Sequence, residues 1–430
     1  MLKTQAKPRI QGQKSVLKLA CEPIDVVRIG IIGLGLRGYR ALNRLIRIEG
    51  VKIKALCDVL PQNTARSQKL LRTLQHNEAS VYIGQDVWKQ LCDRDDIDLV
   101  YICTDWLSHT PMAVYAMEQN KHTAIEVPAA MTIEQCWQLV DTAERKQRHC
   151  IMLENCCYDS FELTTLNMAQ QGLFGEIIHA EGAYIHDLRE KNFTSVSDGG
   201  FYENWQRQFN ISYTGNPYPT HGLGPLCQIM NIHRGDKMNH LVSVSSKQAG
   251  MTQYAKEKFG EKSPEAMQEY RQGDMNTTLI KTEKGKTMMI QHDTTSPRPY
   301  SRIHLISGTK GFAQKYPKAQ IALSPNAGIP LKRKAFLSLL SDYEHPFTKE
   351  WGESAKGICR ERARDFIMDS RLIYCLRNGL PLDQDVYDAA EWSSIVALSQ
   401  MSVLSNGEPV EIPDFTRGLW GELKTLSFCL

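Results

Sequence analysis

Short apolar runs alternate with amphipathic segments over the first third of the 430-residue chain. The runs are rich in Val, Ile and Leu and predict strands at 26–32, 51–58, 81–83, 98–104, 122–127 and 150–155. Apolar residues recur at helical spacing between them, most clearly at 62–74 and 133–146. A further helix is expected to begin after His109-Thr110-Pro111. Apolar strands joined by helices indicate a parallel sheet covered on both faces, so we expect an α/β, doubly wound domain over residues 25–155.

The pattern changes after Asn155. Predicted strands follow at 176–184, 241–246, 277–282, 286–293 and 302–307, and the turn at 283–285 closes a hairpin. Predicted helices lie at 161–169, 226–232, 360–377 and 386–404, whereas 187–217 and 315–357 show little periodicity and 253–273 is a charged excursion. We expect a second, α+β domain over 156–430, with a largely antiparallel open sheet and C-terminal helices that pack back toward the first domain. Residues 1–24 form a polar arm, either disordered or lying on a neighbouring surface.

The first predicted strand ends in a glycine turn, Gly33, Gly35 and Gly38, and the second strand ends in Asp58. Gly33 permits a tight turn, Gly35 lets a pyrophosphate approach the backbone, and Gly38 lets the helix lie against the strand. The N–H groups at the start of that helix then face the anion. A carboxylate at Asp58 accepts both ribose hydroxyls of an adenosine and repels a 2′-phosphate. The segment therefore predicts a dinucleotide site that favours NAD over NADP.

Several polar or aromatic side chains follow the ends of the predicted strands. They are Trp106 and His109 after one strand, Glu126 at the end of the next, and Asn155 after the last. Ligands bind outside the carboxyl ends of parallel strands, so these residues are candidates for the same rim. A packing role for Trp106 and a helix N-cap role for His109 remain alternatives.

The second domain offers tyrosines and histidines beside Pro- or Gly-fixed bends, namely Tyr184, His186, Tyr218, His221 and Tyr300. Tyr184 and His186 share one side of a strand end by period-two geometry. Such side chains position sugar hydroxyls and exchange protons near neutral pH. Taken singly, each is better explained as a tyrosine that caps a core or a histidine that bonds to backbone; as a set they indicate a site. No metal-binding spacing and no Gly-x-Ser-x-Gly elbow accompany them, so no metal is expected.

Composition narrows the class of protein. The formal net charge of +3 gives no reason to expect nucleic acid as a partner. The twelve cysteines form no C-x-x-C pair and several lie in apolar runs, which favours a reducing compartment. No apolar stretch has signal-peptide or membrane-spanning character, so we expect no membrane partner and a cytoplasmic location, unless a native export segment is missing from the chain. The open face of the second sheet needs cover, so we expect a homo-oligomer.

The N-terminal half resembles the Gfo/Idh/MocA oxidoreductase family. The resemblance is carried by the glycine turn and by T-D-W-L-S-H-T-P-M-A-V-Y-A-M-E-Q-N-K-H-T-A-I-E-V-P, which begins at Thr104. It implies a Rossmann domain. That family usually reads Glu-Lys-Pro, with the lysine beside the nicotinamide, where this chain has Glu126-Val127-Pro128.

A closer resemblance, from about Val26 to the C-terminus, is to glycoside hydrolase family 109. It is carried by G-L-G-L-R-G, H-C-I-M-L-E-N-C-C-Y-D, E-G-A-Y-I-H-D-L, Y-P-T-H-G-L-G-P, N-I-H-R-G-D and P-D-F-T-R-G. The resemblance implies NAD contacts at Leu36, Arg37, Asp58, Trp106, His109, Glu126, Val127 and Asn155. It implies sugar contacts at Tyr184, Tyr218, Pro219, Thr220, His221 and Tyr300. At one further sugar-binding position the family has Trp-Arg where this chain has Trp205-Gln206, and the resemblance leaves the neighbouring Arg207 as the candidate sugar contact there.

The resemblance implies hydrolysis of α-N-acetylgalactosaminides with NAD as a tightly bound, recycled cofactor. In that mechanism the sugar is oxidised at C3, loses the C2 proton and the C1 substituent, adds water and is reduced again. It needs no pair of flanking carboxylates, and no such pair stands out in the second-domain motifs. Tyr184, His186, His221 and Tyr300 are the candidate acids and bases. The alternatives are a sugar or inositol dehydrogenase, against which Val127 argues, and a non-enzymatic sugar- or NAD-responsive protein.

Overall fold

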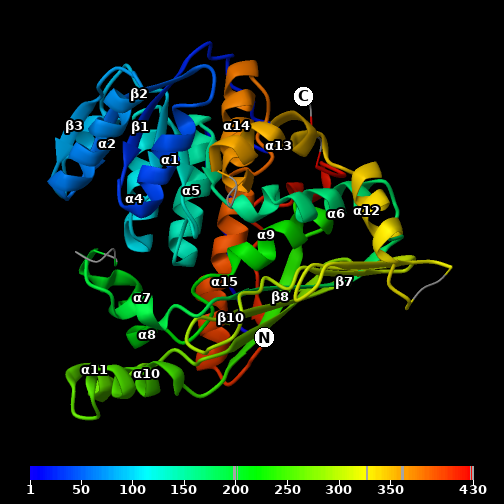
Figure 1. The fold of residues 1–430 in the computed structure, drawn as a ribbon. Helices are drawn as coiled ribbons and strands as arrows, with labels where there is room; N and C mark the ends of the chain where they lie inside the picture. The colour runs from blue at the N-terminus through cyan, green and yellow to red at the C-terminus, as the bar shows by residue number, and fades with distance from the viewer. Residues whose placement is uncertain (197–199, 201, 326–327, 360–362, 427, 429–430) are drawn as a thin grey trace.

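The computed structural model describes residues 1–196, 200, 202–325, 328–359, 363–426 and 428 (Figure 1). A six-stranded parallel sheet in the order β3-β2-β1-β4-β5-β6 forms the N-terminal part. Its strands are β1 (Val27–Ile32), β2 (Val51–Asp58), β3 (Ser80–Ile83), β4 (Leu99–Ile102), β5 (His122–Ile125) and β6 (Cys150–Met152). Four residues in a row are buried in β4 and in β5, as a sheet covered on both faces requires. The predicted doubly wound sheet is confirmed.

Helices α1 (Leu36–Leu45), α2 (Pro61–Thr73), α3 (Trp88–Cys92), α4 (Trp106–Glu118) and α5 (Ile133–Lys146) connect these strands. The predicted start of α4 was wrong. Asp105 caps the helix, and its side chain accepts from the backbone N–H groups of Leu107 and Ser108. His109 therefore lies inside the helix, and Pro111 is an interior proline. An N-cap carboxylate outweighs the proline signal because it satisfies two otherwise unpaired N–H groups.

The second sheet has eight strands in the order β13-β12-β11-β7-β10-β9-β8-β14. They are β7 (Ile177–Ile185), β8 (Met238–Ser245), β9 (Asn276–Thr282), β10 (Thr287–Asp293), β11 (Leu305–Gly308), β12 (Gly311–Gln314), β13 (Gln320–Leu323) and β14 (Val410–Glu411). Neighbours run antiparallel except β7 and β10, which are parallel. The hairpin of β9 and β10 and the largely antiparallel character are confirmed.

Helices lie in three segments for which the sequence predicted none: 187–217 was predicted to be irregular, 253–273 to be a charged surface excursion, and 315–357 showed little periodicity. α7 (Arg189–Phe193), η2 (Tyr202–Asn204) and α8 (Trp205–Ser212) lie within 187–217. α10 (Gly250–Phe259) and α11 (Pro264–Met267) lie within 253–273 or just before it, and α12 (Arg333–Asp342) and α13 (Pro346–Cys359) within 315–357. Most are short, and a helix of one to three turns carries too few apolar positions to show a period. The irregular structure predicted for 187–217 was therefore wrong.

One face of the second sheet carries helices that reach the first sheet. η1 (Asn155–Tyr158), α6 (Ser160–Gln170) and α9 (Thr220–Ile229) lie between the two sheets. α14 (Ala363–Asn378) contacts α1, and α15 (Val386–Leu404) contacts both α5 and β8, so the C-terminal helices join the two parts of the chain (Figure 1). Residues 360–362, where the first of them was predicted to begin, lie outside the described residues. Asp385 and Asp388 form a capping box that fixes the start of α15.

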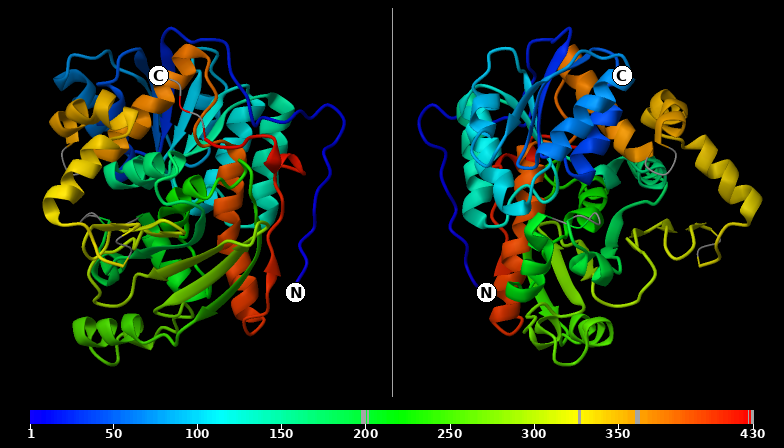
Figure 2. Two further views of the ribbon diagram at one scale, coloured as in Figure 1. Left: turned by 90° about the vertical axis from the view of Figure 1, so that its right-hand side faces the viewer. Right: turned by 60° about the vertical axis from the view of Figure 1, so that its left-hand side comes forward.

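The N-terminal arm lies on the surface of its own chain, along the outer side of α15 (Figure 2). Leu2 pairs with Val410 of β14, Arg9 forms an ion pair with Glu144 of α5, and the backbone N–H of Val16 donates to the Tyr387 hydroxyl. Along the described chain, no helix has the length and apolar character to cross a membrane.

Candidate active site

The glycine turn has the geometry that its sequence predicts. Gly33 has φ +84°, and a Cβ there would lie 2.6 Å from the Cys103 carbonyl oxygen. A Cβ on Gly38 would overlap the Gly33 carbonyl. Packing therefore requires glycine at these two positions. Gly35 differs, because nothing lies within 4 Å of an added Cβ. The open space faces the start of α1, where backbone N–H groups favour an anion, so the turn fits a pyrophosphate.

Asp58 lies at the carboxyl end of β2, beside this turn. One carboxylate oxygen accepts from the Leu34 N–H at 2.5 Å, and the other accepts from Leu60 N–H at 2.8 Å and Asn63 Nδ2 at 3.1 Å. These bonds hold the side chain against the turn. A carboxylate has about four acceptor sites, so capacity remains for a ribose hydroxyl.

The predicted cofactor residues Arg37, Glu126 and Asn155 belong to one hydrogen-bond network that includes Asp365 of α14. Arg37 Nε donates to Glu126 at 2.5 Å and its Nη1 to Asp365 at 3.3 Å, while Asn155 Nδ2 donates to the other oxygen of Asp365. Asp365 is fully buried. The strand ends of the first sheet are thus tied to the C-terminal helix by one charged network. Nothing in the sequence near residue 365 pointed to this role.

Trp106, His109 and Val127 line the same rim from α4 and the end of β5. His109 is buried, and its ring nitrogens lie 2.8 Å from the Pro128 carbonyl and 3.1 Å from the Thr104 carbonyl. Burial lowers the pKa of His109, so the ring is neutral at pH 7. A neutral ring carries one N–H, so it donates a hydrogen bond to one of these two carbonyls. Leu36, at the first position of α1, is half exposed.

The second-domain tyrosines and histidines come together as predicted. The Tyr184 hydroxyl lies 2.9 Å from His186 Nδ1, and the Tyr184 ring lies 4.8 Å from Tyr218, 5.4 Å from His221 and 6.4 Å from Tyr300 between centroids. Tyr184 lies in β7 and His186 directly follows it, while His221 lies at the start of α9, with Pro219 as the N-cap and Thr220 buried in the first turn. Burial lowers the pKa of His186 and raises that of Tyr300 to about 12.

His221 has a partner that sequence reasoning missed. Its Nδ1 lies 2.7 and 2.9 Å from the two carboxylate oxygens of Glu154, which is fully buried. Burial disfavours the charged ring, but Cys156 and Glu154 outweigh it and raise the pKa of His221 to about 9. Burial likewise opposes ionisation of Glu154, yet His221 lowers its pKa to about 2. The pair is therefore an imidazolium and a carboxylate at neutral pH.

The sequence feature that could have pointed to Glu154 is its place after a buried strand, beside Asn155.

One ligand atom from each of Glu154, Cys156 and His221 lies within 4.8 Å of the others, which is a spacing that could hold a metal ion. Sequence spacing gave no sign of this cluster. Both Glu154 oxygens already face the imidazolium, so the geometry fits an ion pair.

Trp106 links the two halves of the site. Its ring stacks on Tyr218 of the second domain with centroids 5.4 Å apart, and Trp205 and Phe209 of α8 pack against it at 4.8 and 4.7 Å. Gln206 lines a hollow with Trp106, Tyr184 and Tyr218. Arg207 does not line this hollow; its guanidinium lies 5.3 Å from the centre of the Phe193 ring. The predicted substitution of Arg207 for the missing arginine finds no support in this geometry.

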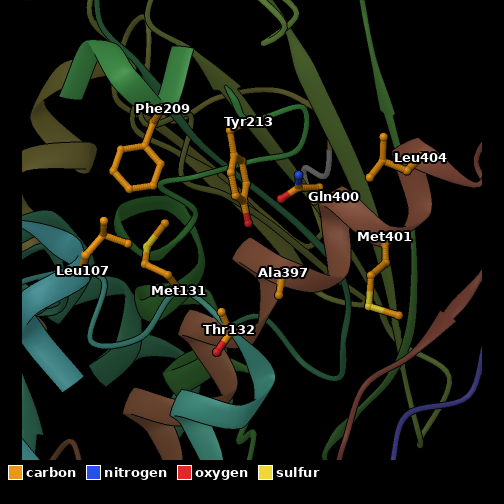
Figure 3. A pocket seen from close by; sticks show the side chains of 9 residues that line it. All are labelled: Leu107, Met131, Thr132, Phe209, Tyr213, Ala397, Gln400, Met401 and Leu404. Atoms are coloured by element: carbon orange, nitrogen blue, oxygen red, sulfur yellow. The ribbon is translucent and has the colours of Figure 1, made fainter. Parts of the chain in front are cut away.

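A second cavity, of about 360 Å³, lies on the other side of Phe209 (Figure 3). Leu107, Met131 and Tyr213 line it together with one side of α15. The tyrosines and histidines that mark the predicted sugar site do not line it. We therefore place the candidate active site at the Trp106 and Tyr218 contact and not in this cavity.

A glycine turn at one sheet and a cluster of tyrosines and histidines at the other meet at Trp106 and Tyr218, within the fold of NAD-binding oxidoreductases. The family described as "Oxidoreductase family, NAD-binding Rossmann fold" matches residues 27–154, and "Glycosyl hydrolase 109, C-terminal domain" matches residues 158–422. The chain belongs to the glycosyl hydrolase 109 family, as the resemblance of its motifs predicted. It is an enzyme that acts on glycosides.

Curated relatives match nearly the whole chain. An "Alpha-N-acetylgalactosaminidase" from Bacteroides fragilis is 62% identical over 409 residues, covering 95% of this chain and 96% of the relative. A "Glycosyl hydrolase family 109 protein 2" from Phocaeicola vulgatus is 56% identical, covering 95% and 99%. Among solved structures, an oxidoreductase domain protein from Kribbella flavida matches with TM-score 0.69 at 16% identity, covering 90% and 100%. Levoglucosan dehydrogenase with NADH and L-sorbose matches with TM-score 0.67 at 18% identity, covering 91% and 100%. These structural matches support the fold.

Proposed function

We propose that this enzyme hydrolyses α-N-acetylgalactosaminides through an oxidation, elimination, hydration and reduction sequence in which NAD is tightly bound and recycled. The observation that carries the proposal is the meeting of the dinucleotide rim with the tyrosine and histidine cluster at Trp106 and Tyr218. The 62% identical relative from B. fragilis, named for this activity, supports the choice of sugar.

The residues around the glycine turn fit NAD. Gly35 leaves open space at the start of α1, and Asp58 lies at the strand end where an adenosine ribose binds in this fold. Arg37, Glu126 and Asn155 line the rim nearer the second domain. When bound, NAD⁺ would accept hydride from C3 of the sugar and return it after the glycosidic bond has broken.

The environments of the two histidines support different roles for them, one as acid and one as base. His221 is an imidazolium at neutral pH, so its ring donates to a substrate oxygen that gains negative charge. His186 is neutral, so its Nδ1 accepts the proton of the Tyr184 hydroxyl at 2.9 Å. Tyr184 Oη then takes the C2 proton of the oxidised sugar. When the surroundings raise the pKa of one group and lower that of another, the first can act as the general acid and the second as the general base.

The test uses a chromogenic α-N-acetylgalactosaminide in D₂O, with enzyme as purified and no added cofactor. We expect glycoside release, deuterium at C2 of the product and no accumulation of NADH. NADH that accumulates with an oxidised, uncleaved sugar after NAD⁺ is supplied would instead make this a dehydrogenase. Denaturing the purified enzyme is expected to release NAD; its absence would overturn tight binding.

Two further proposals concern the assembly and its place in the cell. The face of the second sheet that carries exposed Ile178, Val244 and Leu279 supports self-association, which sedimentation would test. Location in the cytoplasm is supported only by the reduced state expected for its cysteines, and fractionation of the source cells tests it.

A further inference from the structure

Helices α1 and α14 are in contact through a row of alternating charges. Arg37 and Arg44 lie about two turns apart on α1, and Asp365 and Asp369 lie one turn apart on α14. Asp365 Oδ2 lies 3.3 Å from Arg37 Nη1 and 3.7 Å from Arg44 Nη1, and Asp369 Oδ2 lies 2.7 Å from Arg44 Nε. Burial opposes the ionisation of Asp365, but Arg37 and Arg44 outweigh it and lower its pKa. Of the two carboxylates, Asp365 therefore lies nearer the glycine turn, where α1 begins.

The two carboxylates are equally buried but hold different residues. Both are fully buried. One oxygen of Asp365 accepts from Arg37 and the other accepts from Asn155 Nδ2. The bonds of Asp369 come from Arg44 and from the Tyr101 hydroxyl, at 2.7 and 2.9 Å. Asp365 thus orients two residues to which the family resemblance assigns NAD contacts, and Asp369 is bonded to two other residues.

Arg37 is held from two sides and still has donors to offer. Its Nε donates to Glu126 at 2.5 Å and its Nη1 to Asp365 at 3.3 Å, and the side chain is 27% exposed. A guanidinium carries five N–H groups, so donors remain for an anion after these two bonds. Arg37 is the second residue of α1, beside the open space at Gly35. A side chain fixed before the ligand arrives loses less conformational entropy on binding.

We propose that Asp365 is a positioning residue for the dinucleotide. It holds Arg37 and Asn155 in the orientations that bind the cofactor, so retention of NAD depends on the contact of α14 with α1. The proposal rests on the proposed function for the identity of the cofactor. One support of the nucleotide site then comes from the C-terminal part of the chain. By the reciprocity of linked equilibria, bound NAD in turn stabilises the contact between the two helices.

The test compares NAD binding by the wild type, Asp365→Asn and, as the matched control, Asp369→Asn. Asparagine keeps the size of the side chain and removes its charge. Purified holoenzyme is dialysed while the NAD retained per chain is followed, and the affinity is then measured by fluorescence titration with NAD⁺. We expect Asp365→Asn to lose NAD faster and to bind it about ten- to a hundredfold more weakly, the range of one hydrogen bond to a charged group. Both variants should lower Tm, whereas Asp369→Asn should bind NAD with nearly the wild-type affinity.

A double-mutant cycle separates positioning from a general loss of stability. In an Arg37→Met background, Asp365→Asn should weaken NAD binding less than it does in the wild type, because one of the two side chains that Asp365 holds is gone. Equal NAD affinity in Asp365→Asn and the wild type would overturn the proposal. So would an equal loss of affinity in Asp369→Asn, since the effect would then come from any buried charge on α14.

Hydrogen exchange of the wild type decides the question if Asp365→Asn does not fold. We expect bound NAD to slow exchange of the α14 amides, residues 363–378, and identical exchange with and without NAD would overturn the proposal. A wild type that binds no NAD would overturn this proposal and the NAD-dependent function together. A wild type that binds NAD but releases no sugar would overturn the proposed function alone, and the binding comparison would still decide the role of Asp365.

Discussion

The pairing of Glu154 with His221 makes a quantitative prediction for Glu154→Gln. The substitution keeps the size of the side chain and removes the buried negative charge that lies 2.7 Å from the imidazole nitrogen. Cys156 alone then opposes the effect of burial on the ring. We expect the pKa of His221 to fall from about 9 toward its ordinary value of 6.5. That change corresponds to about 3 kcal/mol of lost preference for the imidazolium.

The predicted consequence is that kcat/KM of Glu154→Gln declines at a lower pH than kcat/KM of the wild type. If the imidazolium is the form that acts on substrate, wild-type kcat/KM should decline only as the pH rises through about 9. In Glu154→Gln at pH 7.5, only about one ring in ten stays protonated, so kcat/KM should fall roughly tenfold. At pH 5.5 about nine rings in ten are protonated, and the variant should approach the wild type.

The matched control is Glu391→Gln. Glu391 is also buried and pairs with His233, whose pKa is likewise raised to about 9, but this pair lies outside the site. Steady-state kinetics over pH 5–10 should show the moved limb only for Glu154→Gln. A basic limb that stays near pH 9 in Glu154→Gln would refute the role of the pair.

The same pair contributes stability over a defined pH range. The His221 contribution is complete below pH 6.5, its ordinary pKa, and is lost as the pH rises through about 9. The Glu154 contribution is complete above pH 4.5 and is lost as the pH falls through about 2. Urea unfolding should therefore show the largest deficit of Glu154→Gln between pH 4.5 and 6.5.

Three further predictions concern the first sheet. Gly35→Ala should leave Tm within a few degrees of the wild type, because its Cβ meets no other atom of the protein. The same Cβ occupies the space predicted for the pyrophosphate, so NAD binding should weaken at least tenfold in a fluorescence titration. Gly38→Ala should lower Tm strongly, because its Cβ meets a backbone carbonyl. Asp58→Asn should reduce the preference for NAD over NADP at least tenfold in the same titration, since the repelling charge is gone; an unchanged ratio would contradict the assignment. Arg44→Met should lower the free energy of unfolding by about 3–5 kcal/mol in urea, because the buried Asp369 loses the guanidinium that balances its charge and keeps only the hydrogen bond from the Tyr101 hydroxyl; a loss below 1 kcal/mol would contradict this.

The sequence alone was sufficient to predict those features whose residue pattern lies within one short segment of the chain. The glycine turn fixes its own backbone, and Asp58 follows at the next strand end, so a dinucleotide site could be predicted from residues 26–58 alone. Helices α5 and α15 were predicted at their observed bounds because each has several turns of periodic apolar residues. The helices α7, α8 and α12 were missed because short helices owe their stability to packing.

The sequence by itself determined the class of the two sheets, and it predicted the glycine turn and the tyrosines and histidines of the candidate site. Only the tertiary structure decided which of these side chains lie together. Glu154 and His221 are 67 residues apart and Arg44 and Asp369 are 325 apart, and neither pair leaves a local trace in the sequence. The charge state of His221 depends on that distant carboxylate and on burial, because an ionisation equilibrium responds to every charge and every loss of water around the group. No periodicity along the chain records those surroundings.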